Sequence, residues 1–242
     1  MLIAFEGVDG SGKATQVELL ADKLTSMCDA DGMSTHSVFQ FSFPEYQKNF
    51  FGNKVKKYLN GAYGSLLRNH PFMTSLLYSL DRFESRDQLW LAVNYGNSIV
   101  LCDRYVTSNV GHQAGKLMAL GGEWLQLIKD IETVEYEILG LPMPDLVIYL
   151  DLTPAQSYAR THGRDAKTDL HQGDLQHLEY TQRVYRHCVA TRASWHLVPC
   201  FTADDNRERT PEEIHAEILA LVQSKINLEA GTTEAASVVA WG

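Results

Sequence analysis

A glycine-rich turn close to the start of the chain constrains the fold more than any other feature. Residues 2–16 read LIAFEGVDGSGKATQ, which is an apolar run, a turn with three glycines and the beginning of a helical pattern. Glycines allow backbone N–H groups to converge on an anion. Lys13 adds a mobile positive charge where the dipole of the following helix is also positive. The spacing Gly7-x4-Gly12-Lys13 is that of a P-loop, which holds nucleotide phosphates. The expected phosphate-binding residues are Gly7, Gly10, Ser11, Gly12, Lys13, Ala14 and Thr15.

Ala14 departs from the P-loop pattern, because a Ser or Thr at this position normally places its hydroxyl on Mg²⁺. The metal must then be held mostly by phosphates, water and another acid. Asp103 and Arg104 end an apolar strand pattern, at the sheet edge where the P-loop also begins. We expect Asp103 to orient Mg²⁺ or its waters and Arg104 to bind a phosphate bidentately. A structural ion pair between these two residues is the alternative.

Composition limits the class of protein. The chain has 242 residues, enough for one α/β domain or at most two small domains. Its formal net charge of −9 does not favour a nucleic-acid partner. No apolar run reaches the ~20 residues of a membrane span, and the first strand begins at once, so neither a membrane anchor nor a signal peptide is expected. The four cysteines are scattered without a CxxC pair, which favours a reducing, cytoplasmic location and no zinc site.

The order of the patterns predicts an α/β fold of the three-layer P-loop type, in which helices flank a central parallel sheet of about five strands. We expect a single domain over residues 1–226. Residues 227–242 have no amphipathic period and are expected to be a disordered tail. After the first strand, further strands are predicted at 36–41, 97–102, 146–150 and 195–201. Helices are predicted at 17–26, 52–60, 71–95, 124–139, from 153, at 173–190 and at 211–226.

Two further stretches carry candidate chemistry. Tyr78 and Arg82 are four residues apart and share a helix face, where they could hold a base by stacking and hydrogen bonds; a core tyrosine and a surface arginine are the alternative. Residues 160–173 interrupt the helical pattern with Arg160, Arg164 and Lys167. This segment is typical of a mobile lid that closes on phosphates, with a plain flexible loop as the alternative.

Several of these segments together resemble the thymidylate kinase family, in order and at consistent spacing from Met1 to about Ser224. The P-loop sequence FEGVDGSGK carries that family's acid at its third position. His112 stands where the family often has Tyr or Phe, and Tyr46 stands where some members carry an arginine on the monophosphate. The other segments that carry the resemblance are FPEY at 43–46, YLNGAYG at 58–64, LLYSLDR at 76–82, DRYVTSN at 103–109 and KTDLHQGD at 167–174.

The resemblance implies transfer of the γ-phosphoryl group of ATP to dTMP, which gives ADP and dTDP, with Mg²⁺ and on a homodimer. The catalytic residues that it implies are Lys13, Asp9, Arg104, Arg164 and Arg160. The substrate-binding residues that it implies are Asp9, Phe43, Pro44, Leu59, Tyr78, Arg82, Arg104, Ser108, Asn109, His112 and Gln113.

The lid is expected to supply the arginine of the transition state. Some thymidylate kinases carry that arginine in the P-loop, but this loop has the uncharged Ser11 after Asp9-Gly10. Arg164 is therefore the candidate for the transition-state contact, and Arg160 the candidate for the ATP phosphates or for stacking on adenine.

Two other functions stay open. One is a kinase of another nucleoside monophosphate or of a deoxynucleoside, built on the same P-loop and lid. The other is a P-loop protein that binds a nucleotide without turnover, for which Ala14 is the one hint.

Overall fold

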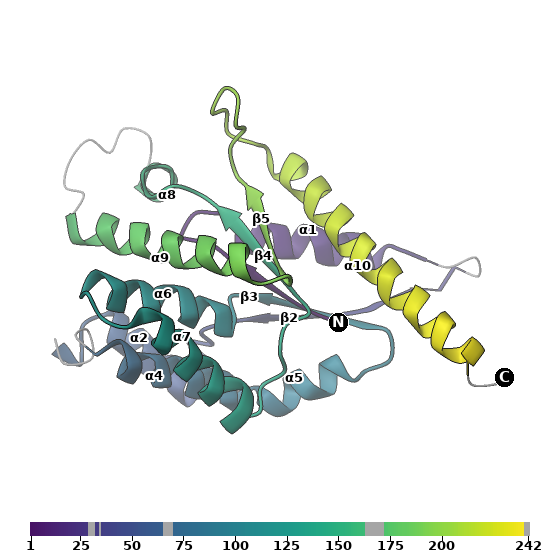
Figure 1. Ribbon diagram of the computed structural model, residues 1–242. Helices are drawn as coiled ribbons and strands as arrows, with labels where there is room; N and C mark the ends of the chain where they lie inside the picture. The colour runs from purple at the N-terminus through teal and green to yellow at the C-terminus, as the bar shows by residue number, and fades with distance from the viewer. Residues whose placement is uncertain (29–31, 34, 65–69, 163–171, 240–242) are drawn as a thin grey trace.

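The computed structural model describes residues 1–28, 32, 33, 35–64, 70–162 and 172–239. Its centre is one sheet of five strands in the order β2-β3-β1-β4-β5, and every neighbouring pair is parallel (Figure 1). The predicted α/β fold with a parallel sheet is confirmed. Because β1 is the middle strand, the P-loop leaves the centre of the sheet. The strands are β1 Leu2–Glu6, β2 Ser37–Ser42, β3 Ser98–Asp103, β4 Leu146–Asp151 and β5 Trp195–Pro199.

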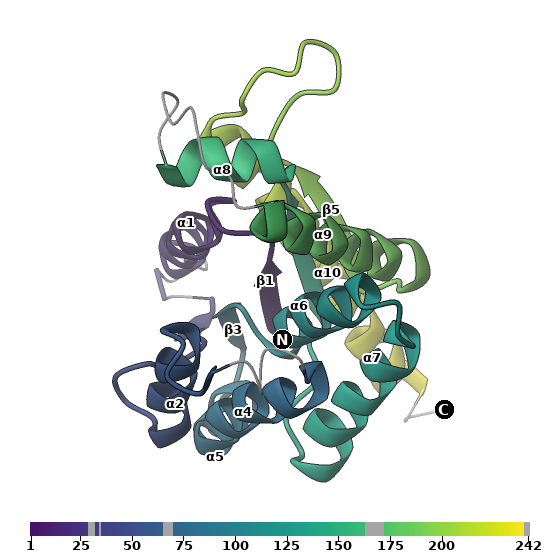
Figure 2. The same cartoon turned by 90° about the vertical axis from the view of Figure 1, so that its left-hand side faces the viewer.

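Helices cover both faces of the sheet. The helices α1 and α10 bury apolar side chains on one face, and α5, α6, α7 and α9 do so on the other. Figure 2 shows α1 on one side of β1 and α6 with α9 on the opposite side. The bounds are α1 Lys13–Thr25, α2 Phe50–Leu59, α4 Pro71–Glu84, α5 Arg86–Val93, α6 Val106–Ala119, α7 Trp124–Glu132, the π-helix η1 Thr133–Ile138, α8 Pro154–His162, α9 Gln172–Thr191 and α10 Pro211–Val239.

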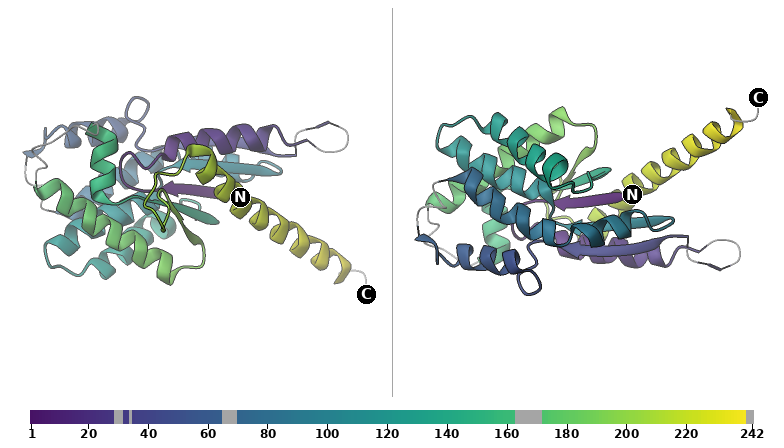
Figure 3. Two further views of the ribbon diagram at one scale, coloured as in Figure 1. Left: turned by 90° about the horizontal axis from the view of Figure 1, so that it is seen from above. Right: turned by 90° about the horizontal axis from the view of Figure 1, so that it is seen from below.

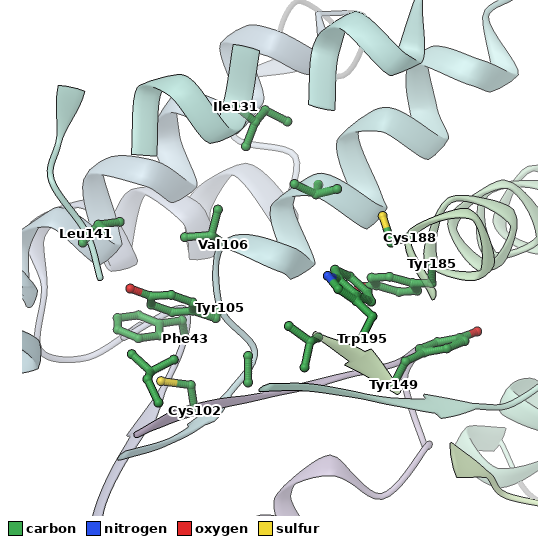
Figure 4. Close-up of a cluster of buried hydrophobic side chains, with 14 of the residues drawn as sticks. Phe43, Cys102, Tyr105, Val106, Ile131, Leu141, Tyr149, Tyr185, Cys188 and Trp195 are labelled. Carbon is green, nitrogen blue, oxygen red and sulfur yellow. The ribbon is translucent and has the colours of Figure 1, made fainter. Parts of the chain in front are cut away.

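The alternation of side chains along the buried strands produces two cores. In β1, Leu2 and Ala4 join the core beneath α6 and α9, while Ile3 and Phe5 join the core beneath α1 and α10. All residues of β1 are buried, as expected for a central parallel strand that is covered on both faces. Figure 4 shows the first core, where Trp195 and Tyr185 lie close to the sheet.

The predicted helix 71–95 is wrong as a single element, because it breaks at Ser85 into α4 and α5. The backbone of Ser85 lies at φ −99° and ψ 5°, outside the helical region. Its hydroxyl accepts a hydrogen bond of 3.1 Å from the Asn49 side chain, and its N–H bonds the Arg82 carbonyl three residues back. A contact from the loop before α2 therefore stabilises the break, and this contact has no local signature in the sequence.

The predicted helix 124–139 also divides, since α7 ends at Glu132 and η1 follows. The hydrogen bond from Leu139 N to Val134 O spans five residues, which is the π pattern. The wider turn accommodates Glu135, which is fully buried. Glu135 is the partner of Arg82, so the irregular turn serves the interior of the site.

The backbone of α10 is helical as far as Val239, whereas the sequence predicted disorder over 227–242. Figure 3 shows the end of α10 extending away from the sheet. A helix that leaves the body of the protein needs no apolar face, and the Leu, Glu and Ala residues of this stretch favour helix by intrinsic propensity. The predicted boundary at residue 226 stays a prediction, as does the lid at 160–173, of which residues 163–171 lie outside the described residues. None of the described helices combines the length and apolar character that a membrane span requires.

Candidate active site

The P-loop follows β1 and adopts a backbone that requires its glycines. Gly7, Gly10 and Gly12 have φ angles of 150°, 74° and 92°. A side chain at Gly7 would meet Ser11 Oγ at 2.5 Å and Leu150 O at 2.8 Å, so Gly7 also permits close packing of the loop on β4. Ser11 closes the turn through its N–H to Val8 O at 3.2 Å. The loop therefore has the glycine-dependent backbone that the predicted phosphate cradle requires, and Ala14 and Thr15 are exposed on the first turn of α1.

Lys13 folds back over this loop. Its Nζ donates to the carbonyl oxygens of Gly7 and Val8, each at 3.1 Å, and to Ser11 Oγ at 3.4 Å. Burial and, to a smaller extent, the positive charge of Arg104 lower the pKa of Lys13 to about 8. The ammonium group is therefore held at the loop by neutral oxygens, and an anion beside it would favour its charged form.

Glu6 is a buried anchor that sequence reasoning missed. Its carboxylate accepts hydrogen bonds from Tyr105 N at 3.1 Å and Thr107 Oγ1 at 2.6 Å, and also from Ser108 Oγ. Tyr185 Oη donates a further bond of 3.2 Å from α9. Burial raises the pKa of Glu6. These bonds connect the end of β1 to the start of α6. The only signal in the sequence was an acid that ends an apolar strand.

Arg104 sits directly after β3 with φ at 66°, a left-handed backbone that is costly for a residue with a side chain. Its guanidinium lies above the P-loop, where Nη2 donates to Asp9 Oδ1 at 2.5 Å and Nη1 lies 3.3 Å from His112 Nε2. The alternative of an Asp103–Arg104 ion pair is therefore wrong, because Arg104 pairs with Asp9. The guanidinium is held from two sides, with its remaining N–H groups left for a phosphate.

A cavity of about 290 Å³ opens beside Asp9 and Arg104. The structure brings all the predicted substrate-binding residues together on its walls: Asp9, Phe43, Pro44, Leu59, Tyr78, Arg82, Arg104, Ser108, Asn109, His112 and Gln113. We call it the acceptor cavity. Tyr46, from the loop that was expected to face the pocket, also lines it, as do Lys116, His177 and Leu178, to which sequence reasoning assigned no role. Lys116 follows His112 by one helical turn, so periodicity could have found it; His177 and Leu178 come from the distant α9 and gave no signal.

A buried polar network forms one wall of the acceptor cavity. Arg82 is 2% exposed, so the alternative of a surface arginine is wrong. Its Nε and Nη2 donate to the two carboxylate oxygens of Glu135 at 2.6 and 2.5 Å. Arg82 also lines the cavity, and Nη1 is the nitrogen that Glu135 leaves unoccupied.

Asn109 is oriented by the same network. Its Nδ2 donates to Glu135 Oε1 at 2.8 Å and to Ser75 O at 3.0 Å, which fixes which side of the amide carries the oxygen. Within the described part of the chain, no hydrogen-bond partner reaches Asn109 Oδ1 or the buried Gln113 Oε1. Buried acceptors without partners are rare in folded proteins. Arg82 therefore contributes a donor to this wall, and Asn109 and Gln113 each contribute an acceptor without a partner.

Aromatic side chains also line the acceptor cavity. Tyr78 of α4 packs edge to face on Tyr58 with ring centroids 6.4 Å apart, and Phe43 is 2% exposed beside them. Leu59, at the end of α2, is half exposed at the rim. A cavity that combines flat apolar surface with a polar network suits a planar heterocycle.

The helix α8 clamps the P-loop from above. Ser157 Oγ donates to Asp9 O at 2.6 Å, and Arg160 Nη1 donates to Gly10 O at 2.8 Å. Arg160 also pairs with Glu208 through Nε at 3.0 Å. Arg160 is thus engaged with the loop backbone, and Arg164 lies outside the described residues.

Asp103 faces a second cavity, of about 770 Å³, which Ala14 and the end of β2 also line. Its Oδ1 is buried, and no described residue gives it a hydrogen bond. In the described ranges no group of three or more His, Cys, Asp or Glu residues is placed to hold a metal alone. One unpartnered carboxylate nevertheless fits Mg²⁺, which usually binds one or two carboxylates and completes its shell with water and substrate phosphates.

Comparison with known proteins gives a consistent result. The family model described as thymidylate kinase matches residues 5–218. A thymidylate kinase of Mycobacterium tuberculosis is 31% identical over 199 residues, which cover 78% of this chain and 86% of the relative. One of Schizosaccharomyces pombe is 29% identical over 232 residues, covering 94% and 93%. The solved structure of thymidylate kinase from Candida albicans matches with a TM-score of 0.64 at 20% identity, covering 93% of this chain and 92% of that one.

Proposed function

The chain belongs to the thymidylate kinase family, and we propose which of its residues carry each part of that family's reaction. The protein is a phosphotransferase that transfers the γ-phosphoryl group of ATP to dTMP and releases ADP and dTDP. Because the acceptor is a phosphate anion at neutral pH, it needs little help from a general base. Catalysis is then mainly positioning and neutralisation of charge.

The donor phosphates belong to the P-loop in this proposal. Its backbone N–H groups and Lys13 would hold the β- and γ-phosphates of ATP. Arg104 would bind the acceptor phosphate, since its guanidinium lies between Asp9 of the P-loop and His112 of the acceptor cavity. Asp9 would orient Arg104 and the acceptor sugar. This arrangement would bring the two reacting phosphates next to each other at the P-loop.

One observation carries the assignment of the base: Glu135 orients Arg82 as a donor and Asn109 with its Oδ1 as an acceptor without a partner, and both residues line the acceptor cavity. Thymine presents O4 as an acceptor and N3–H as a donor. Arg82 Nη1 matches O4, and Asn109 Oδ1 or Gln113 Oε1 matches N3–H. Cytosine reverses both groups and would oppose donor to donor and acceptor to acceptor. Tyr78 and Phe43 would stack on the ring, which is worth about 1–3 kcal/mol per base.

An acceptor panel tests the proposal. ADP release from ATP is measured with dTMP, dUMP, dCMP, dGMP and thymidine as acceptors. We expect kcat/KM for dTMP to exceed that for dCMP by roughly 10⁴, because mismatched buried polar groups reject a substrate strongly. Equal rates with dCMP would contradict the base assignment. The absence of ADP release with every acceptor would favour a nucleotide-binding protein without turnover. Folded Lys13→Ala is the inactive control.

Mg²⁺ is proposed as the metal, with Asp103 and its waters as the protein's contribution. When bound, Mg²⁺ neutralises charge on the ATP phosphates. Ala14 offers no hydroxyl for this purpose, so the metal would depend on Asp103 more than in a standard P-loop.

We propose that the protein acts as a homodimer through α4. Met73, Leu76, Leu77 and Leu80 lie on one face of α4 and are exposed or half exposed. Tyr78 and Arg82 lie on the opposite face, toward the acceptor cavity. An apolar stripe of this kind is typical of an interface. A cytoplasmic location, without nucleic-acid or membrane partners, also remains part of the proposal and is supported by four free cysteines.

A further inference from the structure

Two histidines stand in a row with Arg104 on the wall of the acceptor cavity. His112 on α6 places Nε2 3.3 Å from Arg104 Nη1, and its Nδ1 lies 3.3 Å from Nε2 of His177 on α9. The two imidazole rings are 5.5 Å apart between centroids and inclined by 32°. Both histidines line the cavity. Arg104 therefore contacts His112, and His112 in turn contacts His177.

The chemistry of arginine sets the direction of every bond in this row. A guanidinium has only donors, so His112 Nε2 must be the acceptor and carry no proton. The proton of a neutral His112 is then on Nδ1, which donates to His177. His177 Nε2 is the acceptor of that bond, so it too is unprotonated. One permanently charged residue thus fixes the tautomers of two neutral ones.

The surroundings keep His112 neutral. Burial holds the pKa of His112 well below its ordinary value, and the charge of Arg104 lowers it further. The other charged or titratable groups that act on it are His177 of α9, Lys116 of α6 itself and Lys13 of the P-loop, and all of them disfavour a second positive charge. Tyr185 of α9 contacts the ring edge to face at 6.3 Å. A neutral acceptor at Nε2 is the form that Arg104 needs.

Arg104 gains a fixed direction from this arrangement. Asp9 holds Nη2 from the P-loop side, and His112 holds Nη1 from the α6 side. A long side chain with many rotamers is thereby restricted before substrate arrives, which lowers the cost of ordering it on binding.

We propose that His112 and His177 are positioning residues for the kinase reaction. His112 holds the Arg104 guanidinium toward the acceptor phosphate by accepting its hydrogen bond, and His177 stabilises the tautomer of His112 that can do so. This rests on the proposed role of Arg104 as the acceptor-phosphate ligand. The two histidines thereby determine how well dTMP is oriented, and they do not affect the binding of ATP.

A matched pair of substitutions tests which ring nitrogen matters. In His112→Gln the amide oxygen can take the place of Nε2, so Arg104 keeps its acceptor. In His112→Asn the amide reaches only the position of Nδ1, and in His112→Phe there is no acceptor at all. We expect Asn and Phe to lower kcat/KM for dTMP about tenfold, the loss of one bond to a charged group. Gln should stay within about threefold of wild type, and KM for ATP should not change in any variant.

The substitutions His177→Gln and His177→Leu make the same comparison, with and without an acceptor, at the second histidine. Gln keeps an acceptor where Nε2 stands and should retain activity with dTMP, whereas Leu should lose part of it. Equal melting temperatures show that the variants fold alike. The proposal is overturned when His112→Phe keeps the wild-type kcat and KM for dTMP, or when His112→Gln is as impaired as His112→Asn.

Nitrogen-15 NMR of the imidazoles decides the arrangement independently of activity. We expect His112 and His177 to show the Nδ1–H tautomer at neutral pH, and His112 to keep it in His177→Gln. An Nε2–H tautomer at His112 would overturn the row of bonds even in an active enzyme. If the wild type shows the expected tautomers but no activity with dTMP, the bonds stand and the proposed function fails.

Discussion

Lys13 shows how strongly one residue depends on its surroundings. Its pKa falls from 10.5 to about 8 on burial in the P-loop. Between these two values the unfolded chain binds more protons than the folded protein, so the free energy of unfolding rises with pH across this window. Below pH 8 both states carry the proton, and this residue adds no pH dependence. A nucleotide phosphate beside Lys13 opposes the shift, because a nearby anion favours the ammonium form.

This linkage predicts that ATP binding takes up a proton above pH 8. At pH 9 we expect uptake of about one proton per ATP bound, since Lys13 is then mostly neutral until the phosphates arrive. Isothermal titration calorimetry in buffers of different ionisation enthalpy measures the uptake directly. At pH 7 the uptake by this residue should vanish. Lys13→Arg is the matched control, because arginine keeps its charge at both pH values. Equal proton uptake at pH 9 in the wild type and Lys13→Arg would contradict the assignment.

Glu135 is the residue on which the polar wall of the acceptor cavity depends. It is fully buried and balances the charge of Arg82, while it also orients Asn109. Removing one partner of a buried ion pair leaves the other charge uncompensated, at a cost of about 3–5 kcal/mol.

We therefore expect Glu135→Ala to lower the free energy of unfolding by about 3–5 kcal/mol, measured by urea denaturation. Glu135→Gln keeps the shape and one acceptor oxygen, so its loss should be smaller. Both variants should raise KM for dTMP, since Arg82 and Asn109 lose their orientation. A Glu135→Ala variant as stable as wild type would show that Arg82 finds solvent or another partner.

Among single residues, sequence reasoning found those that directly follow a strand or belong to a segment that resembles the family. Arg82 and Asn109 were among them, but their partner Glu135 was not. Glu135 is 53 residues from Arg82 along the chain and lies in the π-helix η1. A pattern search along one chain has no access to such a pair, because each residue alone is typical of a helix surface.

Among the elements, α8 is the one whose role the structure changes most. It was expected to lead into the lid, and it does end where that segment begins. It also bonds two carbonyl groups of the P-loop, through Ser157 and Arg160. Side chains of Arg160 and Thr161 would lie within 3.3 Å of a β-carbon at Gly10, so the approach is close. The helix thus supports the shape of the phosphate cradle from outside.

The two lid arginines are therefore expected to behave differently. Arg164→Ala should lower kcat at least roughly a hundredfold with little change in KM for dTMP, if Arg164 meets the charge of the transferring phosphoryl group. Arg160→Ala should mainly raise KM for ATP, because the P-loop loses a support. Steady-state kinetics with each substrate varied separates the two. A near-normal Arg164→Ala with a dead Arg160→Ala would exchange the roles. High activity in the double mutant would exclude the lid from catalysis.

Element boundaries were predictable where the signal was local. The strands and α1 follow from apolar runs, glycine turns and helical spacing. The breaks at Ser85 and after Glu132 were not predictable, because Asn49 and Arg82 produce them from elsewhere in the chain. The end of α10 was missed for the opposite reason. The prediction rests on amphipathic spacing, which a helix that projects from the body does not need.

At the scale of the whole molecule, topology assembles the site. The P-loop, the loop after β2 and Arg104 after β3 all leave the same edge of the sheet, as parallel strands require. The acceptor cavity then closes with α4, α6 and α9. The first group could be placed from the sequence by this rule. The contribution of α9, and with it His177, depended on how the helices pack and could not be placed.

The side chains on the two faces of α4 indicate why this helix should bind a second copy of the chain. One face of α4 carries Tyr78 and Arg82 for the acceptor cavity, and the other carries a stripe of exposed or half-exposed apolar side chains. Met73 is 53% exposed and Phe83 is 44% exposed along this side. A two-fold interface would cover the stripe and stiffen the helix that carries Tyr78 and Arg82.

We expect the wild type to run as a dimer in light scattering coupled to size-exclusion chromatography. Leu80→Glu should shift it toward monomer, because the charge would be buried opposite its own copy. Since α4 then loses support, KM for dTMP should rise about threefold to tenfold, an effect of 1 kcal/mol or so, while KM for ATP stays unchanged. Leu120→Glu, an exposed position at the end of α6 outside the stripe, is the matched control and should remain dimeric. A wild type that is monomeric at high concentration, or a Leu80→Glu variant that stays dimeric, would remove α4 as the interface.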